Sequence, residues 1–212
     1  MEEKTKIRGL FIFIIFYLLF FLFLAIIKGN YEFIFYISFL SILSLLMIIY
    51  RKKLHFPVYI LFFFILCGFL HLAGGNFYFN GTRLYDIFLI NHLLRFDNLM
   101  HFFGSFIYSF LIYNFLRPHL DLKVKQNPFF LSTIIILVAV GIGSLNESLE
   151  FSAASMGFAP GVGGCINTSL DLIYNTIGAV IASIFIVRYH RKLSHLKLLF
   201  FKIIPKIYSC KN

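Results

Sequence analysis

Six long apolar segments constrain the fold of this 212-residue chain more than any other feature. A helix needs about 20 mostly apolar residues to cross the hydrocarbon of a bilayer. Strands of a membrane barrel would alternate apolar and polar residues, whereas these segments are continuous. The sequence therefore predicts an all-α fold, a polytopic integral membrane protein with six transmembrane helices. The segments are residues 7–27, 31–50, 56–73, 99–116, 129–149 and 169–187.

The basic residues predict how these helices are oriented. Of the 19 Lys and Arg residues, 16 lie at the N-terminus, in the second and fourth connections, or in the C-terminal tail. These parts lie on one side of a six-helix chain, and Lys and Arg are enriched on the cytoplasmic side. Only Lys28, Arg83 and Arg95 remain for the outer side. We therefore predict a multi-pass protein of the cell membrane whose N-terminus and C-terminus are both cytoplasmic.

The end of the sixth apolar segment divides the chain into two parts. Residues 1–187 form the predicted transmembrane domain, and residues 188–212 form a basic cytoplasmic tail with interleaved apolar residues. Such an amphipathic segment is expected to lie at the membrane interface, on anionic lipid head groups. The net charge of +10 is thus concentrated beside the membrane. We expect membrane lipids as partners, and no nucleic acid.

Two outer connections have distinctive compositions. Residues 85–96 are apolar but too few to span a bilayer, so they predict an interfacial or re-entrant helix. Residues 157–164 are rich in glycine and carry no charge. A mobile cover over a site and a plain flexible connector both fit the second segment, and the sequence does not decide between them.

The last three apolar segments each carry a pair of polar residues near the outer end. The two members of each pair are three or four residues apart, and residues at this spacing share one face of a helix. Ionisable side chains are costly in hydrocarbon, so a cluster of them predicts a functional site at the outer face of the membrane. The pairs are Asp97 with His101, Glu147 with Glu150, and Asp171 with Asn175.

Carboxylates and imidazole together suit a divalent metal ion such as Mg²⁺, Mn²⁺, Zn²⁺ or iron. A metal ion would neutralise the clustered acids and could polarise a phosphoryl or carbonyl group. Without a metal, a carboxylate and the imidazole could serve as acid and base. The candidate metal ligands are Asp97, His101, Glu147, Glu150 and Asp171, of which the first four are also candidate catalytic residues. His71 and Asn175 are candidate supporting residues.

A purely structural interpretation of the same residues stays open. Polar side chains near helix ends can hydrogen-bond neighbouring helices without any further function. Asp97 directly precedes an apolar segment and suits the N-cap of a helix. Asp171 lies near the start of its predicted helix, where the helix dipole favours a negative charge.

These residues resemble the motifs of two families. His71-Leu-Ala-Gly-Gly and Arg95-Phe-Asp97-Asn-Leu-Met-His101-Phe-Phe-Gly104 resemble the YjdF-type inner-membrane proteins, a family of unassigned function. The later acids and Asp171-Leu-Ile-Tyr-Asn175-Thr-Ile-Gly178 extend this resemblance, which covers residues 71–182. The last three helices also resemble the VanZ-like proteins, which are associated with glycopeptide resistance. The chain departs from the VanZ-like pattern at Glu150, where Gln is frequent, and lacks the Trp residues of the YjdF-type pattern.

Neither resemblance implies a reaction, so the expected function comes from the residues. The leading hypothesis is a cell-envelope protein that binds or modifies a lipid or lipid-linked head group, with or without a divalent metal ion. A transporter is the first alternative, and a structural or assembly protein whose polar residues join its helices is the second. The sequence leaves open whether the protein is an enzyme.

Overall fold

The computed structural model describes residues 3–54, 56–91, 93–157 and 164–209. Within these ranges, six helices are long and apolar enough to cross a membrane, which confirms the predicted all-α, six-helix fold. A short helix, α5 (Leu122–Gln126), joins the fourth and fifth of them. The long helices are α1 (Glu3–Lys28), α2 (Tyr31–Leu54), α3 (Val58–Asn76), α4 (Phe96–Leu116), α6 (Pro128–Ser155) and α7 (Cys165–Ser209).

Local sequence signals account for several helix ends. Gly29 adopts a positive φ of 63° between α1 and α2, a conformation that favours glycine. Asn127 caps α6, because its side-chain oxygen accepts hydrogen bonds from the backbone N–H groups of Phe129 and Phe130. α7 continues as one helix through residue 187 to Ser209. The glycine-rich 157–164 loop lies largely outside the described residues.

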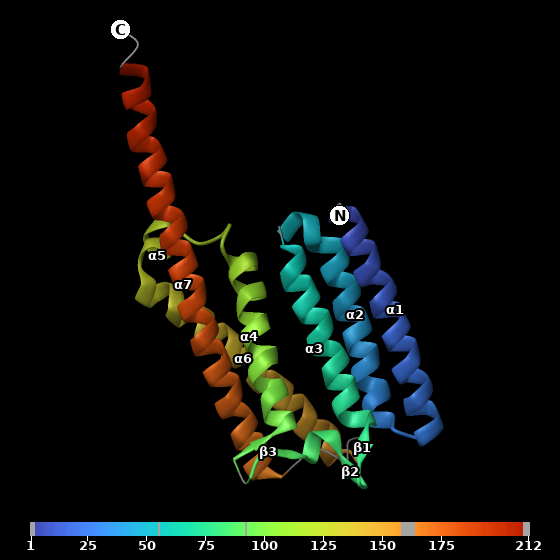
Figure 1. Cartoon of the computed structure of the whole chain (residues 1–212). Helices are drawn as coiled ribbons and strands as arrows, with labels where there is room; N and C mark the ends of the chain where they lie inside the picture. The colour runs from blue at the N-terminus through green and yellow to red at the C-terminus, as the bar shows by residue number, and fades with distance from the viewer. Residues whose placement is uncertain (1–2, 55, 92, 158–163, 210–212) are drawn as a thin grey trace.

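The six long helices form two groups (Figure 1). α1, α2 and α3 pack on one another, and α4, α6 and α7 form the second group, joined to the first mainly through α3 and α4. Both chain ends lie on one side of the molecule, and the short strands lie on the other (Figure 1). We call the latter the hairpin side. Which side faces the cytoplasm stays a prediction.

The connection between α3 and α4 forms two small hairpins on the hairpin side. β1 (Tyr78–Phe79) pairs with β2 (Thr82–Arg83), and β3 (Phe88–Ile90) pairs with β4 (Leu94–Arg95), both antiparallel. A 3-10 turn, η1 (Leu84–Asp86), separates the two hairpins. The predicted interfacial helix at 85–96 was therefore wrong. The strand pairing of this apolar segment satisfies its backbone groups instead, and the Arg95 guanidinium lies 4.9 Å from the centre of the Phe88 ring.

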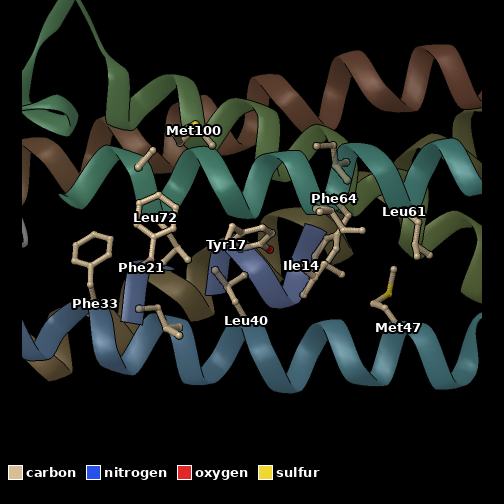
Figure 2. Packing of buried hydrophobic residues seen from close by; sticks show 14 of the residues in the cluster. Ile14, Tyr17, Phe21, Phe33, Leu40, Met47, Leu61, Phe64, Leu72 and Met100 are labelled. Carbon is tan, nitrogen blue, oxygen red and sulfur yellow. The ribbon is translucent and has the colours of Figure 1, made fainter. Parts of the chain in front are cut away.

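Aromatic and aliphatic side chains fill the first group of helices (Figure 2). Phe21 and Phe33 are completely buried. Gly75 leaves the space that the Phe33 ring fills, because a Cβ atom there would overlap the ring. This packing holds α3 in place, so that α3 and α2 form one wall of the site described below.

Candidate functional site

The hairpin-side ends of α4, α6 and α7 bring His101 among three carboxylates. Its Nε2 lies 3.6 Å from Oδ1 of Asp97 and 3.8 Å from Oδ1 of Asp171. Its Nδ1 lies 3.2 Å from Oε1 of Glu147. The three pairs that the sequence placed on separate helices thus meet around one imidazole, which fits the spacing argument. These contacts give His101 two distinct sides, one on each ring nitrogen.

The Nε2 side is organised by two asparagines. Asn98 and Asn167 each donate a hydrogen bond of 2.7 Å to Asp171, one to each carboxylate oxygen. Asn167 also donates to Oδ2 of Asp97 over 3.1 Å and accepts a hydrogen bond from Arg95, again over 3.1 Å. Sequence reasoning missed both asparagines. The available signal was spacing, since Asn167 precedes Asp171 by one helical turn and Asn98 follows Asp97 directly.

The structure corrects the two helix-end roles that the sequence suggested for Asp97 and Asp171. α4 begins at Phe96 with Arg95 as its N-cap, so Asp97 lies in the first turn and is not the cap. The Asn98 side chain performs the capping, because its oxygen accepts a hydrogen bond from the backbone N–H of Arg95. α7 begins at Cys165, so Asp171 lies in the second turn, beyond the strongest influence of the helix dipole.

The Nδ1 side of His101 contains a buried carboxylate oxygen that makes no hydrogen bond. Glu147 is only 5% exposed, and its Oε1 makes no hydrogen bond. Glu150, one turn away, accepts a hydrogen bond of 2.8 Å from Asn146. Nδ2 of Asn175 lies 3.4 Å from Nδ1 of His101. The Asn175 side chain packs against Gly143, where a residue with a Cβ atom would obstruct it.

Among the residues that the structure describes, two sets of side chains could hold a metal ion, and both include His101. One set is Asp97, His101 and Asp171; the other is His101, Glu147 and Glu150. In each set the candidate ligand atoms lie within 4.8 Å of one another. All five candidate ligands therefore belong to one buried group, in which the imidazole is shared.

A cavity of about 450 Å³ adjoins this group. It is lined by side chains from α2, α3, η1, α4, α6 and α7, and its volume is typical of pockets for small molecules. Asp97, His101 and Glu150 form part of its lining, whereas Leu43 and Phe64 contribute apolar surface. The site is therefore amphipathic, with ionisable groups beside an apolar wall.

His71 lies on the cavity wall, apart from the two ligand sets. Its Nδ1 is hydrogen-bonded to the hydroxyl of Tyr85, which belongs to η1. Burial raises the pKa of Tyr85 well above its ordinary value, so this hydroxyl stays protonated. His71 thus joins α3 to the hairpin segment, which is a supporting position.

Residues 9–192 match the DUF2238 family of predicted membrane proteins, and the chain belongs to this family. No curated protein and no solved structure matches the chain. The YjdF-type and VanZ-like resemblances accordingly stay predictions. The family description agrees with the six membrane spans and specifies no reaction.

Proposed function

We propose that this protein binds the polar head group of a membrane lipid or lipid-linked envelope molecule through a divalent metal ion. The ion would be held by His101, Glu147 and Glu150. The observation that carries the proposal is the buried Oε1 of Glu147, which makes no hydrogen bond and lies 3.2 Å from an imidazole nitrogen. A buried carboxylate oxygen without a hydrogen bond is costly, and a metal ion bound between it and His101 would remove this cost.

The spacing of these two atoms supports a shared ion. Nitrogen and oxygen ligands lie about 2.1 Å from Zn²⁺, which separates adjacent ligand atoms by roughly 3.0 Å in octahedral and 3.4 Å in tetrahedral geometry. The observed separation of 3.2 Å between Glu147 and His101 falls between these two values. Glu150 could supply a third ligand atom from the next turn of α6.

The opposite side of the imidazole supports the assignment. A neutral imidazole carries one proton and offers one lone pair. With the proton on Nε2, facing Asp97 and Asp171, the Nδ1 lone pair faces Glu147 and would bind a metal ion in place of its long 3.4 Å hydrogen bond from Asn175. Because both Asp171 oxygens already accept amide hydrogen bonds, this side orients the ring, as carboxylates beyond a metal ligand commonly do.

The cavity supports a lipid head group as the ligand. Phosphoryl oxygens bind hard divalent ions, and a bound ion would polarise a phosphoryl group. The apolar wall beside the ionisable groups suits a molecule that is polar at one end and apolar at the other. Clustering of the acids on the hairpin side disfavours a transporter, because a proton path would need polar groups along the whole span.

The metal content of the purified protein tests this proposal. We expect wild type, incubated with Mg²⁺, Mn²⁺, Zn²⁺ or Fe²⁺ and then desalted, to retain one of these ions stoichiometrically in elemental mass spectrometry. Glu147→Gln should lose the ion because it removes a ligand charge, and the Glu147→Ala, Asp171→Ala double variant should lose it too. Asp171→Asn should weaken binding about 10- to 100-fold, the usual effect of altering a residue that orients a ligand.

Asp121→Asn is the matched control, because Asp121 is an exposed N-cap residue of α5 that lies outside the site. It changes the same chemical group and should retain the ion. Thermal unfolding of each variant in detergent checks that the fold is intact. A wild type without metal, or a folded Glu147→Gln variant that retains it, would overturn the proposal.

A further inference from the structure

The cavity beside His101 reaches the lipid-facing surface between α2 and α6. Phe39 of α2 and Leu145 and Leu149 of α6 all line the cavity, yet their side chains are 47%, 66% and 55% exposed. A second, smaller cavity is lined by Phe35, Phe39 and Leu149, among others, and continues along the same two helices. We call this α2–α6 boundary the seam.

The position of the seam determines what can reach it. α2 and α6 are both membrane spans, so exposed apolar residues along them face lipid chains. Contacts between α2 and α6 are sparse compared with those inside either helix group. An acyl chain is the apolar molecule available at this depth, and the cavity interior offers it apolar residues such as Leu43, Phe64 and Tyr108.

The charges at the polar end of the cavity select a head group. Three carboxylates and the Arg83 guanidinium line this end, and two further carboxylates lie behind it around His101, with Arg95 bonded to Asn167. A divalent ion would leave this end with a formal excess of negative charge. A zwitterionic head group complements both features, since its phosphate can bind the ion and its amine can approach the remaining acids. The lining carboxylates are those of Glu32, Asp97 and Glu150, and the two behind them are those of Glu147 and Asp171.

We infer that an acyl chain of an aminophospholipid enters the cavity sideways through the seam between α2 and α6 and places its head group at the His101 cluster. The head-group part rests on the proposed function, whereas the chain part rests on the apolar walls and the exposed seam. The ligand class is therefore a phospholipid whose head group carries an amine, such as phosphatidylethanolamine.

Tryptophan fluorescence tests this inference, because the chain contains no native tryptophan. Tyr108→Trp and, independently, Phe64→Trp place one fluorophore on the cavity wall. Each variant is reconstituted in phosphatidylglycerol vesicles that contain a minor fraction of phosphatidylethanolamine with brominated acyl chains. Bromine quenches indole on contact, so both variants should lose as much fluorescence as the lipid-exposed Leu19→Trp variant.

Tyr17→Trp is the matched buried control. Tyr17 is 2% exposed, does not line either cavity, and lies 11 residues from the hairpin-side end of α1, while Tyr108 lies 12 residues from that end of α4. The two positions thus have similar depth. Quenching of Tyr108→Trp and Phe64→Trp that does not exceed that of Tyr17→Trp would overturn the inference.

A second pair of variants tests the seam itself. Leu145→Phe, combined with Tyr108→Trp, enlarges a residue at the seam and should reduce quenching. Leu137→Phe is the control, because Leu137 lies on the same helix and is equally exposed at 66% but does not line the cavity. Equal quenching in both combined variants would exclude the α2–α6 route.

Head group and metal are tested separately. Brominated phosphatidylglycerol should quench Tyr108→Trp less than brominated phosphatidylethanolamine, while Leu19→Trp should respond equally to both. Equal quenching of Tyr108→Trp would overturn the head-group assignment. Quenching that persists in protein shown to bind no metal would support chain insertion and refute the proposed metal function, so the two failures are distinguishable.

Discussion

The two helix groups of this molecule bury different kinds of side chain. α1, α2 and α3 are joined mainly by aromatic and aliphatic packing, in which Phe21 and Phe33 are completely buried (Figure 2). In α4, α6 and α7 the contacts include a hydrogen-bonded polar cluster. Of the nine buried polar residues among those described, seven lie on these three helices, and only Ser44 and Asn76 lie on the first group.

This difference shows that helices in one membrane protein can associate in two ways, by close packing of apolar side chains and by polar contacts. Lipid chains are as apolar as leucine, so helices in a membrane associate through close packing and interhelical hydrogen bonds. The first group uses interlocking rings and forms a wall. The second group uses small residues and polar bonds, with Gly178 of α7 directly against the backbone of Phe102 in α4. The chemistry is thus confined to the group that is also held together by polar contacts.

Among the variants that test this difference between the helix groups, removal of the Asp171 carboxylate should lower the free energy of unfolding most. Asp171→Ala leaves the Asn98 amide without its acceptor at a fully buried position and removes the shorter of the two hydrogen bonds that the Asn167 amide donates. We expect a loss of about 3 kcal/mol in the free energy of unfolding, as for other buried charged groups deprived of a partner. Denaturant unfolding in detergent micelles measures it.

Asp86→Ala is the control for that measurement. Asp86 forms a more exposed ion pair with Arg83, and such pairs contribute at most about 1 kcal/mol. If both variants lost equally little stability, the polar cluster would not be what holds the second helix group together.

Gly178→Ala should have the next largest effect. Its Cβ would collide with the Phe102 carbonyl oxygen, which is backbone and cannot move without separating α4 from α7. We expect a loss of about 1–3 kcal/mol, together with weaker metal retention, because the same two helices carry His101 and Asp171. Gly141→Ala, at a position with open space around it, should instead be neutral or slightly stabilising. A stable Gly178→Ala variant with unchanged metal content would contradict the close-packing argument.

Tyr85 lies at the junction of the two helix groups. At neutral pH, Tyr85→Phe should give the smallest loss in the free energy of unfolding. The variant loses one hydrogen bond to His71, worth about 1 kcal/mol. Burial raises the pKa of Tyr85 in the folded protein, so above pH 10 only the unfolded chain ionises at this residue and stability falls as pH rises. Tyr85→Phe should remove about 1.4 kcal/mol per pH unit from that decline.

Unfolding measured from pH 9 to 11 checks this slope. Tyr78→Phe, which alters an exposed ring on the adjacent hairpin, is the control and should leave the wild-type slope unchanged. An identical slope for Tyr85→Phe would show that Tyr85 is accessible to water, and the two helix groups would then be less tightly joined than the contacts indicate.

Much of the site could be predicted from the spacing of its ionisable residues, but the asparagines that hold Asp171 could not. Helical periodicity brought Asp97 and His101 onto one face, and the cost of burying charge in hydrocarbon indicated that such faces meet. Asn98 and Asn167 were missed because amides are unremarkable near helix ends, and their role appears only when Asp171 is seen between them. The helix expected at 85–96 failed because apolar composition alone does not distinguish a short helix from paired strands.

The sequence by itself determined the six membrane spans, because each span is a local property of some 20 consecutive residues. It also determined which residues are too polar for their surroundings. Only the tertiary structure decided that these residues share one imidazole, that Oε1 of Glu147 is left without a hydrogen bond, and that exposed residues of α2 and α6 line a cavity beside them. Those features depend on how far apart the helices lie and how they are rotated, and both are set by contacts between residues remote in the chain, such as Gly178 and Phe102.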